Sequence, residues 1–180
     1  MNQKFERAQQ DPAYLAWIEA MDDELGRFLA EDAPDLGALA DPYTTDGLAA
    51  CEDVIRDRFG SVHAIDDPGN AQLVDRFTRF IGEVHRRATE GWWVNAAHMR
   101  EGGPVWPQIL RPFSTWALDP REQIAGAFIT DPQQPTQLVW VLNNMLTEYT
   151  RWVGYGRPTP EEYERRYLEE LVAESDGNEL

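Results

Sequence analysis

The stretch that decides the fold spans residues 68–94 and reads PGNAQLVDRFTRFIGEVHRRATEGWWV. Its apolar side chains recur every three or four residues, which is the period of an amphipathic helix; they are Leu73, Phe77, Phe80, Ile81, Val84 and Ala88. Pro68 or Gly69 suits the start of this helix, and Gly91 is typical of a helix end. Trp92-Trp93-Val94 then has the aromatic and β-branched composition of a strand. The stretch therefore predicts a long helix that leads directly into a strand.

The residues after this helix predict a small antiparallel sheet between about residues 92 and 118. Gly102-Gly103-Pro104 is typical of a turn, and residues 105–110 favour a second strand. Pro107 lacks an N–H donor, which indicates an edge strand or a bulge. Residues 114–118 are a candidate for a third strand.

Five more helices are expected around the central one. Asp11-Pro12, Asp119-Pro120 and Thr159-Pro160 each combine an N-cap residue with a proline that suits the first helical position. The five helices are expected at about residues 12–30, 46–59, 120–128, 136–152 and 160–173. The predicted fold class is therefore α+β, mostly helical with about six helices and a small antiparallel sheet. We expect a single domain over residues 1–180, with a frayed tail at residues 175–180.

The chain is strongly acidic, because its 180 residues include 32 acidic and 16 basic ones, for a net charge of −16. A nucleic-acid-binding protein needs clustered Lys and Arg to displace counterions, so this composition argues against nucleic acid as a partner. Residues 1–60 and 131–180 carry net charges of −9 and −6. This acidity either keeps the surface soluble or forms a face for a basic protein partner.

The hydropathy of the chain predicts a cytoplasmic protein with no membrane contact. The first residues, MNQKFERAQQDP, have no apolar stretch after their charges and do not resemble a signal peptide. The longest candidate apolar run, residues 138–142, is far shorter than the roughly 20 residues that span a bilayer. A single cysteine excludes an intrachain disulfide and a Cys-rich zinc site.

No motif in the sequence indicates catalysis, a cofactor or a metal. The three histidines, His63, His85 and His98, form no zinc-protease motif, and no two of them are spaced to share a helical face. Cys51 is a conceivable nucleophile, but its place on the apolar stripe of a helix favours core packing. The sequence also has no nucleophile elbow, phosphate-binding loop or dinucleotide fingerprint. We therefore predict no catalytic residues, no metal ligands and no cofactor.

The tryptophans are the most unusual feature of the sequence. Trp92, Trp93, Trp106 and Trp116 fall within 25 residues of one another, in or near the predicted sheet. Neighbours in a strand point to opposite faces, so Trp92 and Trp93 cannot both enter one core. Either helices cover both faces of the sheet, or one face is an aromatic interaction surface of the kind in which tryptophan is enriched.

Residues 80–94 resemble a motif of uncharacterised bacterial proteins. Gly82-Glu83-Val84-His85-Arg86-Arg87, followed by Gly91-Trp92-Trp93, resembles a Gly-Glu-Val-x-Arg-Arg helix that runs into a Gly-Gly-x-Trp turn and a strand. Glu90 departs from this pattern, which often has a second glycine there. The resemblance supplies no catalytic residue. Some of these proteins look like immunity or accessory proteins, so the resemblance implies a similar role here.

Two functions of different classes follow from these observations. The leading hypothesis is a non-catalytic protein-interaction domain, accessory or immunity-like, with a basic protein as a possible partner. The alternative is a small-molecule-binding protein or an enzyme with a pocket between the sheet and the helix at residues 70–90. The candidate binding residues are Glu83, His85, Trp92, Trp93, His98, Arg100 and Trp106.

Overall fold

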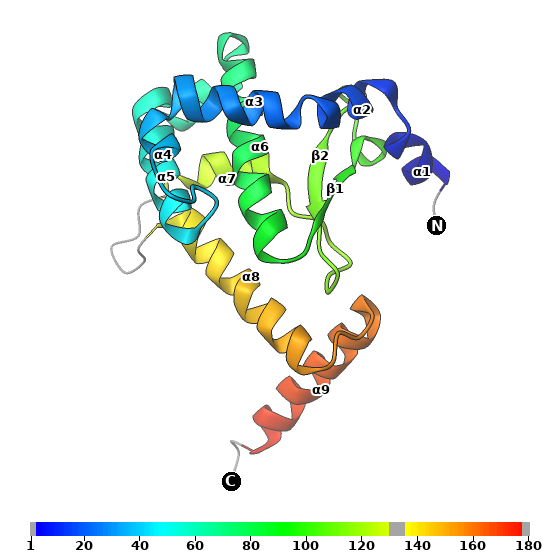
Figure 1. The fold of residues 1–180 in the computed structure, drawn as a ribbon. Helices are drawn as coiled ribbons and strands as arrows, with labels where there is room; N and C mark the ends of the chain where they lie inside the picture. The colour runs from blue at the N-terminus through cyan, green and yellow to red at the C-terminus, as the bar shows by residue number, and fades with distance from the viewer. Residues whose placement is uncertain (1–2, 130–135, 178–180) are drawn as a thin grey trace.

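A long central helix organises the fold, as the sequence predicts. In a computed structural model that describes residues 3–129 and 136–177, this helix is α6 (Ala71–Ala88), and it leads into the hairpin of β1 (Trp92–Asn95) and β2 (Pro107–Leu110) (Figure 1). The other helices are α1 (Gln3–Gln9), α2 (Pro12–Glu19), α3 (Met21–Arg27), α4 (Pro34–Gly37), α5 (Thr45–Phe59), α7 (Pro120–Gly126), α8 (Gln137–Gly154) and α9 (Pro160–Gly177). The mostly helical α+β class with a small antiparallel sheet is confirmed.

The N-terminal helix differs from its prediction, because it is broken at Ala20 into α2 and α3. The break allows the two pieces to pack against different partners. Trp17 of α2 meets Trp93 of the hairpin, with ring centroids 4.9 Å apart. Phe28, which follows α3, meets Phe77 of α6 at the same centroid distance of 4.9 Å. The chain then continues as a π-helical turn and α4.

The two faces of the hairpin have different environments. The strands are antiparallel, with Val94 opposite Gln108 and Trp92 opposite Leu110. Trp93 packs against α6 and the main core, whereas Trp92 is 46% exposed. The prediction that these adjacent indoles do not enter one core is therefore confirmed.

The candidate third strand at residues 114–118 does not form. Leu118 alone reaches β2, where it exchanges two backbone hydrogen bonds of 2.8 and 2.9 Å with Ile109. Just before it, the Ser114 N–H donates to the Arg111 carbonyl at 3.2 Å, and the Ser114 hydroxyl accepts from the Trp116 N–H at 3.1 Å. This turn holds residues 114–117, which precede Leu118, away from the edge of β2.

The main core lies between α6 and the helices that surround it. Phe28 contacts Phe77 and Phe80 of α6, the latter with ring centroids 5.1 Å apart. Cys51 of α5 is fully buried in the same cluster, and burial raises the pKa of its thiol well above the ordinary value. The cysteine therefore packs in the core, as its place on the apolar stripe favours.

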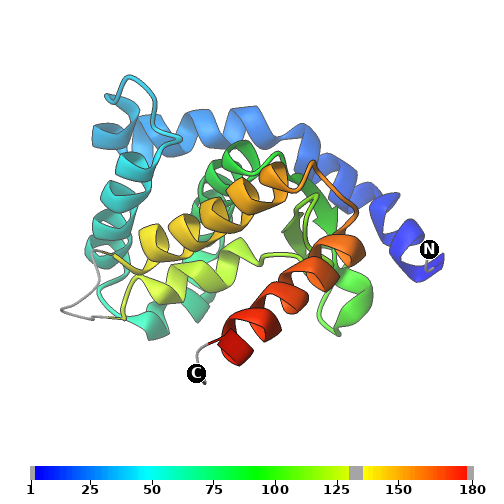
Figure 2. The same cartoon turned by 90° about the horizontal axis from the view of Figure 1, so that it is seen from below.

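Helices α8 and α9 follow one another toward the C-terminal end of the molecule (Figures 1 and 2), and a second, smaller aromatic cluster joins them. Its buried members are Phe113, Trp152 and Tyr163. Glu90, between α6 and β1, accepts hydrogen bonds of 2.6 Å from the Tyr149 hydroxyl and of 2.6 and 2.9 Å from Arg157. One carboxylate thus connects this C-terminal unit to the end of the central helix.

Helix α9 is longer than predicted, since it continues to Gly177, and residues 178–180 of the predicted frayed tail lie outside the described residues. None of the described helices combines the length and the hydropathy that a bilayer crossing requires.

Candidate binding surface on the hairpin

Two of the predicted site residues, Glu83 and Trp93, meet between α6 and β1. The Trp93 indole N–H donates to Glu83 Oε1 at 2.8 Å. The same carboxylate accepts hydrogen bonds from Arg86 at 2.7 Å and from Arg87 at 3.1 Å. Burial raises the pKa of Glu83, but the hydrogen bonds from Arg86, Trp93 and Arg87 outweigh it and lower the pKa below the ordinary value. The polar groups of this pair are therefore satisfied within the protein.

Gly82 explains why the indole of Trp93 can reach this carboxylate. A Cβ at Gly82 would overlap the six-membered ring of Trp93, so only glycine leaves room for the ring against the helix. The Gly-Glu-x-x-Arg-Arg segment and the tryptophan thus act together as a contact between α6 and β1. This contact gives Gly82, Glu83 and Trp93 a structural role.

His85 lies apart from the other candidates, fully buried near the end of α6. Neither of its ring nitrogens has a hydrogen-bond partner among the described residues. Burial, and secondarily the charge of Arg111, lower the pKa of His85 to about 3. The imidazole is therefore neutral at physiological pH and packs as an apolar group.

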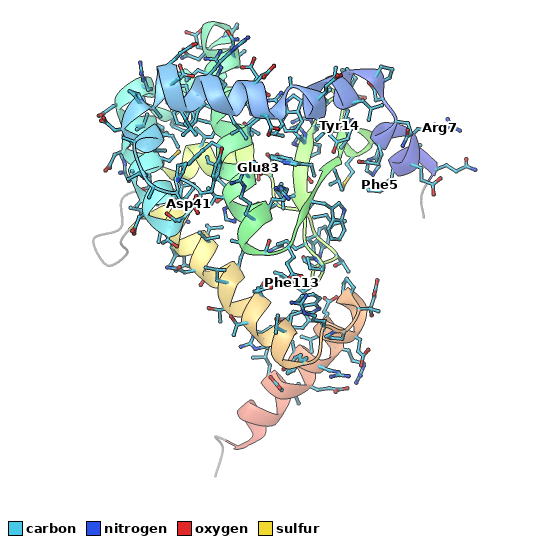
Figure 3. All side chains as sticks on the ribbon, viewed as in Figure 1. Phe5, Arg7, Tyr14, Asp41, Glu83 and Phe113 are labelled. Carbon is cyan, nitrogen blue, oxygen red and sulfur yellow. The ribbon has the colours of Figure 1, made fainter. Side chains whose placement is uncertain are left out.

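His98 and Trp106 border a groove of about 420 Å³ on the face of the hairpin that points away from α6, which we call the outer groove. Its floor is formed by Val94, Gln108 and Leu110, the residues that alternate outward along the two strands. Its walls are mostly aromatic and include Phe5, His98, Met99, Trp106 and Trp116. Phe5 extends from α1 toward the hairpin (Figure 3) and meets the ring of His98 at 5.5 Å.

Gln108 is the unusual residue of the outer groove. Its side chain lies in the floor and the residue is only 8% exposed, yet the amide makes no hydrogen bond with any described residue. The amide atoms are open to the solvent of the groove, whereas Nδ1 of His98 in the groove wall is buried and has no hydrogen-bond partner among the described residues. The amide therefore has donors and an acceptor available to a group bound in the groove.

The rim of the outer groove is both apolar and acidic. Trp116 is 73% exposed and Met99 is 65% exposed, which places two large apolar side chains in solvent beside the groove. Asp119 and Glu122 line the same groove. Asp119 also positions one wall, since its Oδ2 accepts from the Trp106 indole N–H at 2.5 Å. The surface thus offers apolar contact area beside negative charge.

Arg100 lies against Trp106 but lines a different cavity. Its guanidinium stacks over the indole ring, 4.2 Å from the centroid, and borders a cavity between α2, α6 and the segment that precedes β2. The candidates predicted from the sequence, apart from Trp92, which is half exposed on β1 and lines neither cavity, are therefore distributed over four places. These are the contact between α6 and β1, the buried end of α6, and the two cavities on either side of Trp106.

Sequence reasoning missed Gln108, Met99, Phe5 and Glu122 as site residues, and it noted Trp116 without placing it in a site. The sequence could have indicated Gln108, because neighbouring side chains of a strand point to opposite faces. If the apolar Ile109 faces the core, Gln108 faces away from it. Phe5 and Glu122 gave no such signal, since they come from helices that are distant in the sequence.

Among the described residues, no three His, Cys, Asp or Glu side chains lie close enough together to hold a metal ion. Comparison of the chain with protein-family models, with curated proteins and with solved structures gives no match.

Proposed function

We propose that the protein is a non-catalytic protein-interaction domain of the bacterial cytoplasm, whose outer groove binds a segment of a basic partner protein. The amide of Gln108, which has no hydrogen-bond partner among the described residues and lies between mostly aromatic walls, carries this proposal. A peptide main chain presents alternating donors and acceptors that one side-chain amide can bind. The aromatic walls would hold the apolar side chains of the same segment.

The charge of the protein supports a basic partner. Glu122 and Asp119 at the groove would attract Lys or Arg in the bound segment, and the net charge of −16 would steer a cationic partner toward the surface. Residues 80–94 resemble uncharacterised bacterial proteins, some of which look like immunity or accessory proteins, and this resemblance supports the same proposal because such proteins act by binding other proteins.

Selection from a phage-displayed library of random peptides against the immobilised protein tests this function. We expect the selected peptides to combine Arg or Lys with aromatic or branched apolar residues. Calorimetric titration with the synthesised peptides should show binding that Trp116→Ala and Gln108→Leu each weaken at least about tenfold. Trp140→Ala is the control, because Trp140 is exposed on α8 and does not line the groove.

The Gln108→Leu variant separates binding from folding. The amide of Gln108 makes no hydrogen bond with a described residue, so its replacement by leucine should leave the thermal midpoint nearly unchanged while affinity falls. The proposal is wrong if the library yields no binder, if the selected peptides lack basic residues, or if the two groove variants bind them as tightly as the wild type does.

A further inference from the structure

The cavity on the other side of Trp106, which we call the inner cavity, is separate from the outer groove. It has a volume of about 530 Å³ and lies between α2, the first half of α6 and the segment before β2. Ala13 and Ala16 of α2 face Ala71 of α6 across it, so small side chains leave this space open. The volume is within the range of sites that bind small molecules.

Two fixed indoles border the inner cavity. Trp17 donates its N–H to Asp75 Oδ1 at 2.6 Å, and the Arg79 guanidinium lies 4.0 Å from its ring centroid. Trp106 is held by its hydrogen bond to Asp119. These contacts fix both rings before anything binds, and fixed aromatic walls suit a planar apolar group.

The hydrogen-bonding groups of the inner cavity favour an anion. Asp75 already accepts from Trp17 and, at 2.7 Å, from Arg79, which neutralises its charge. Asp119 already accepts from Trp106 and from the Arg121 backbone N–H at 2.9 Å. Both acids therefore already accept hydrogen bonds, although the neutral donors to Asp119 leave its negative charge in place.

Arg100 is the residue of the inner cavity whose N–H donors have no partner among the described residues. Its guanidinium makes no hydrogen bond or ion pair with a described residue, and its one recorded contact is with the ring of Trp106. The side chain of the neighbouring cation, Arg121, is paired with Asp66 at 2.9 Å. The inner cavity thus has spare N–H donors, at a guanidinium whose geometry matches a carboxylate.

We propose that the inner cavity binds a small amphipathic carboxylate. Its planar apolar body would lie against Trp17 and Trp106, and its carboxylate would accept hydrogen bonds from Arg100. This ligand site is distinct from the outer groove, although Trp106 and Asp119 border both cavities.

Calorimetric titration with naphthalene-2-carboxylate and with the neutral naphthalene-2-carboxamide tests the site. We expect the carboxylate to bind at least about tenfold more tightly than the amide, because only the carboxylate forms charge-assisted hydrogen bonds. Arg100→Gln should remove this preference by weakening the carboxylate alone. Equal affinity of the two probes for the wild type, or an unchanged preference in Arg100→Gln, would overturn the proposal.

A filling variant locates the binding. Ala16→Leu should abolish the binding of both probes, since the larger side chain occupies the cavity from an exposed helix position. Glu19→Leu, on the same helix but outside the cavity lining, and Trp116→Ala, in the outer groove, should retain it. The proposal fails if neither probe binds the wild type at millimolar concentration, or if Ala16→Leu binds them normally. Peptide binding by Arg100→Gln reports on the outer groove separately.

Discussion

At the scale of single residues, Gly82 has a clear physical role. A glycine inside a helix costs about 1 kcal/mol relative to alanine, so its presence in α6 requires a compensating contact. The ring of Trp93 supplies that contact by packing where a side chain would otherwise lie. The sequence shows the glycine and the tryptophan but not their meeting, because the register between α6 and β1 depends on the turn that joins them.

Gly82→Ala should therefore destabilise the protein by about 1–3 kcal/mol, although alanine is the better helix former. Trp93→Ala should cost about 3–5 kcal/mol, whereas Trp92→Ala should cost much less because Trp92 is half exposed. In the double variant the two losses should not add, since the clash disappears with the indole. Urea unfolding measures the free energy of unfolding of the three single variants and of the Gly82→Ala, Trp93→Ala double variant. A stabilised Gly82→Ala variant would contradict this account.

His85 predicts a dependence of stability on pH. Its pKa falls from the ordinary 6.5 to about 3 on folding, because burial and the charge of Arg111 disfavour the cation. Below pH 6.5 the unfolded chain binds a proton that the folded chain does not, so the free energy of unfolding falls as pH falls. The loss should reach about 1.5 kcal/mol between pH 6.5 and 5, above the range in which carboxylates titrate.

Urea unfolding across that pH range measures the effect of His85. The variant His85→Leu, which has no titratable group at this position, should show a flatter profile. His63→Ala is the control, because His63 is exposed and should leave the slope as it is. A slope that persists in His85→Leu would assign the effect to other groups.

At the scale of elements, Glu52 connects three helices. This fully buried residue of α5 accepts a hydrogen bond of 2.9 Å from the Leu138 N–H at the start of α8 and pairs with Arg56. Arg56 in turn donates to the Ala127 carbonyl after α7 at 2.7 Å. A carboxylate at a helix N-terminus satisfies a free N–H and interacts favourably with the helix dipole. In so acidic a sequence, nothing distinguishes this residue from the exposed acids around it.

Glu52→Ala should cost about 3 kcal/mol of unfolding free energy, because it leaves the α8 N–H and part of Arg56 without a partner. Glu52→Gln should cost less, since its amide oxygen can still accept from Leu138. Asp53→Ala is the matched control at the next position, where the side chain is 77% exposed, and should change stability by under about 0.5 kcal/mol. Equal losses at the two positions in thermal unfolding would refute the connecting role.

Helix starts could be predicted from the sequence because their signals are local. Asp11 and Thr136 accept backbone N–H groups of their own helices, at 2.9 and 3.3 Å, as N-cap residues do. Helix α1 has no such signal. It is tied to β1 by the Gln9 amide, which donates to the Asn95 carbonyl at 2.9 Å and accepts from the Asn95 N–H at 2.8 Å. A contact across 86 residues leaves no local pattern.

At the scale of the whole molecule, part of the acidity holds the fold together. Arg76 of α6 bonds to Glu24 and Asp32, both at 2.8 Å, and so joins the acidic first third of the chain to the nearly neutral middle. The hydrogen bond from Arg76 also lowers the pKa of Glu24. Composition alone predicts a solvated acidic surface, because it does not show which acids have internal partners.

The acids without internal partners should steer a basic peptide to the outer groove. For a peptide selected as above, the association rate should fall between 0.01 and 0.15 M salt, as the Debye length shrinks from about 30 to about 8 Å. Glu122→Gln should flatten this dependence more than Glu161→Gln at the start of α9. Stopped-flow mixing measures both. A salt-independent rate would assign the acidity to solubility alone.

The tie at Glu90 has a consequence for local unfolding. Glu90 has a φ of 54°, a left-handed conformation that favours glycine, and its carboxylate is the group that bonds Tyr149 and Arg157. Glu90→Gly should relieve the backbone strain while it removes one of the ties to the C-terminal unit, which Phe113 also contacts. In native-state hydrogen exchange, the free energy of local opening should then fall for the amides of α9, while the amides of α6 keep or gain protection. The side chain of Glu90 therefore has two opposite effects. Its left-handed backbone conformation lowers the stability of the whole protein, whereas its hydrogen bonds make the two ends of the molecule unfold more cooperatively.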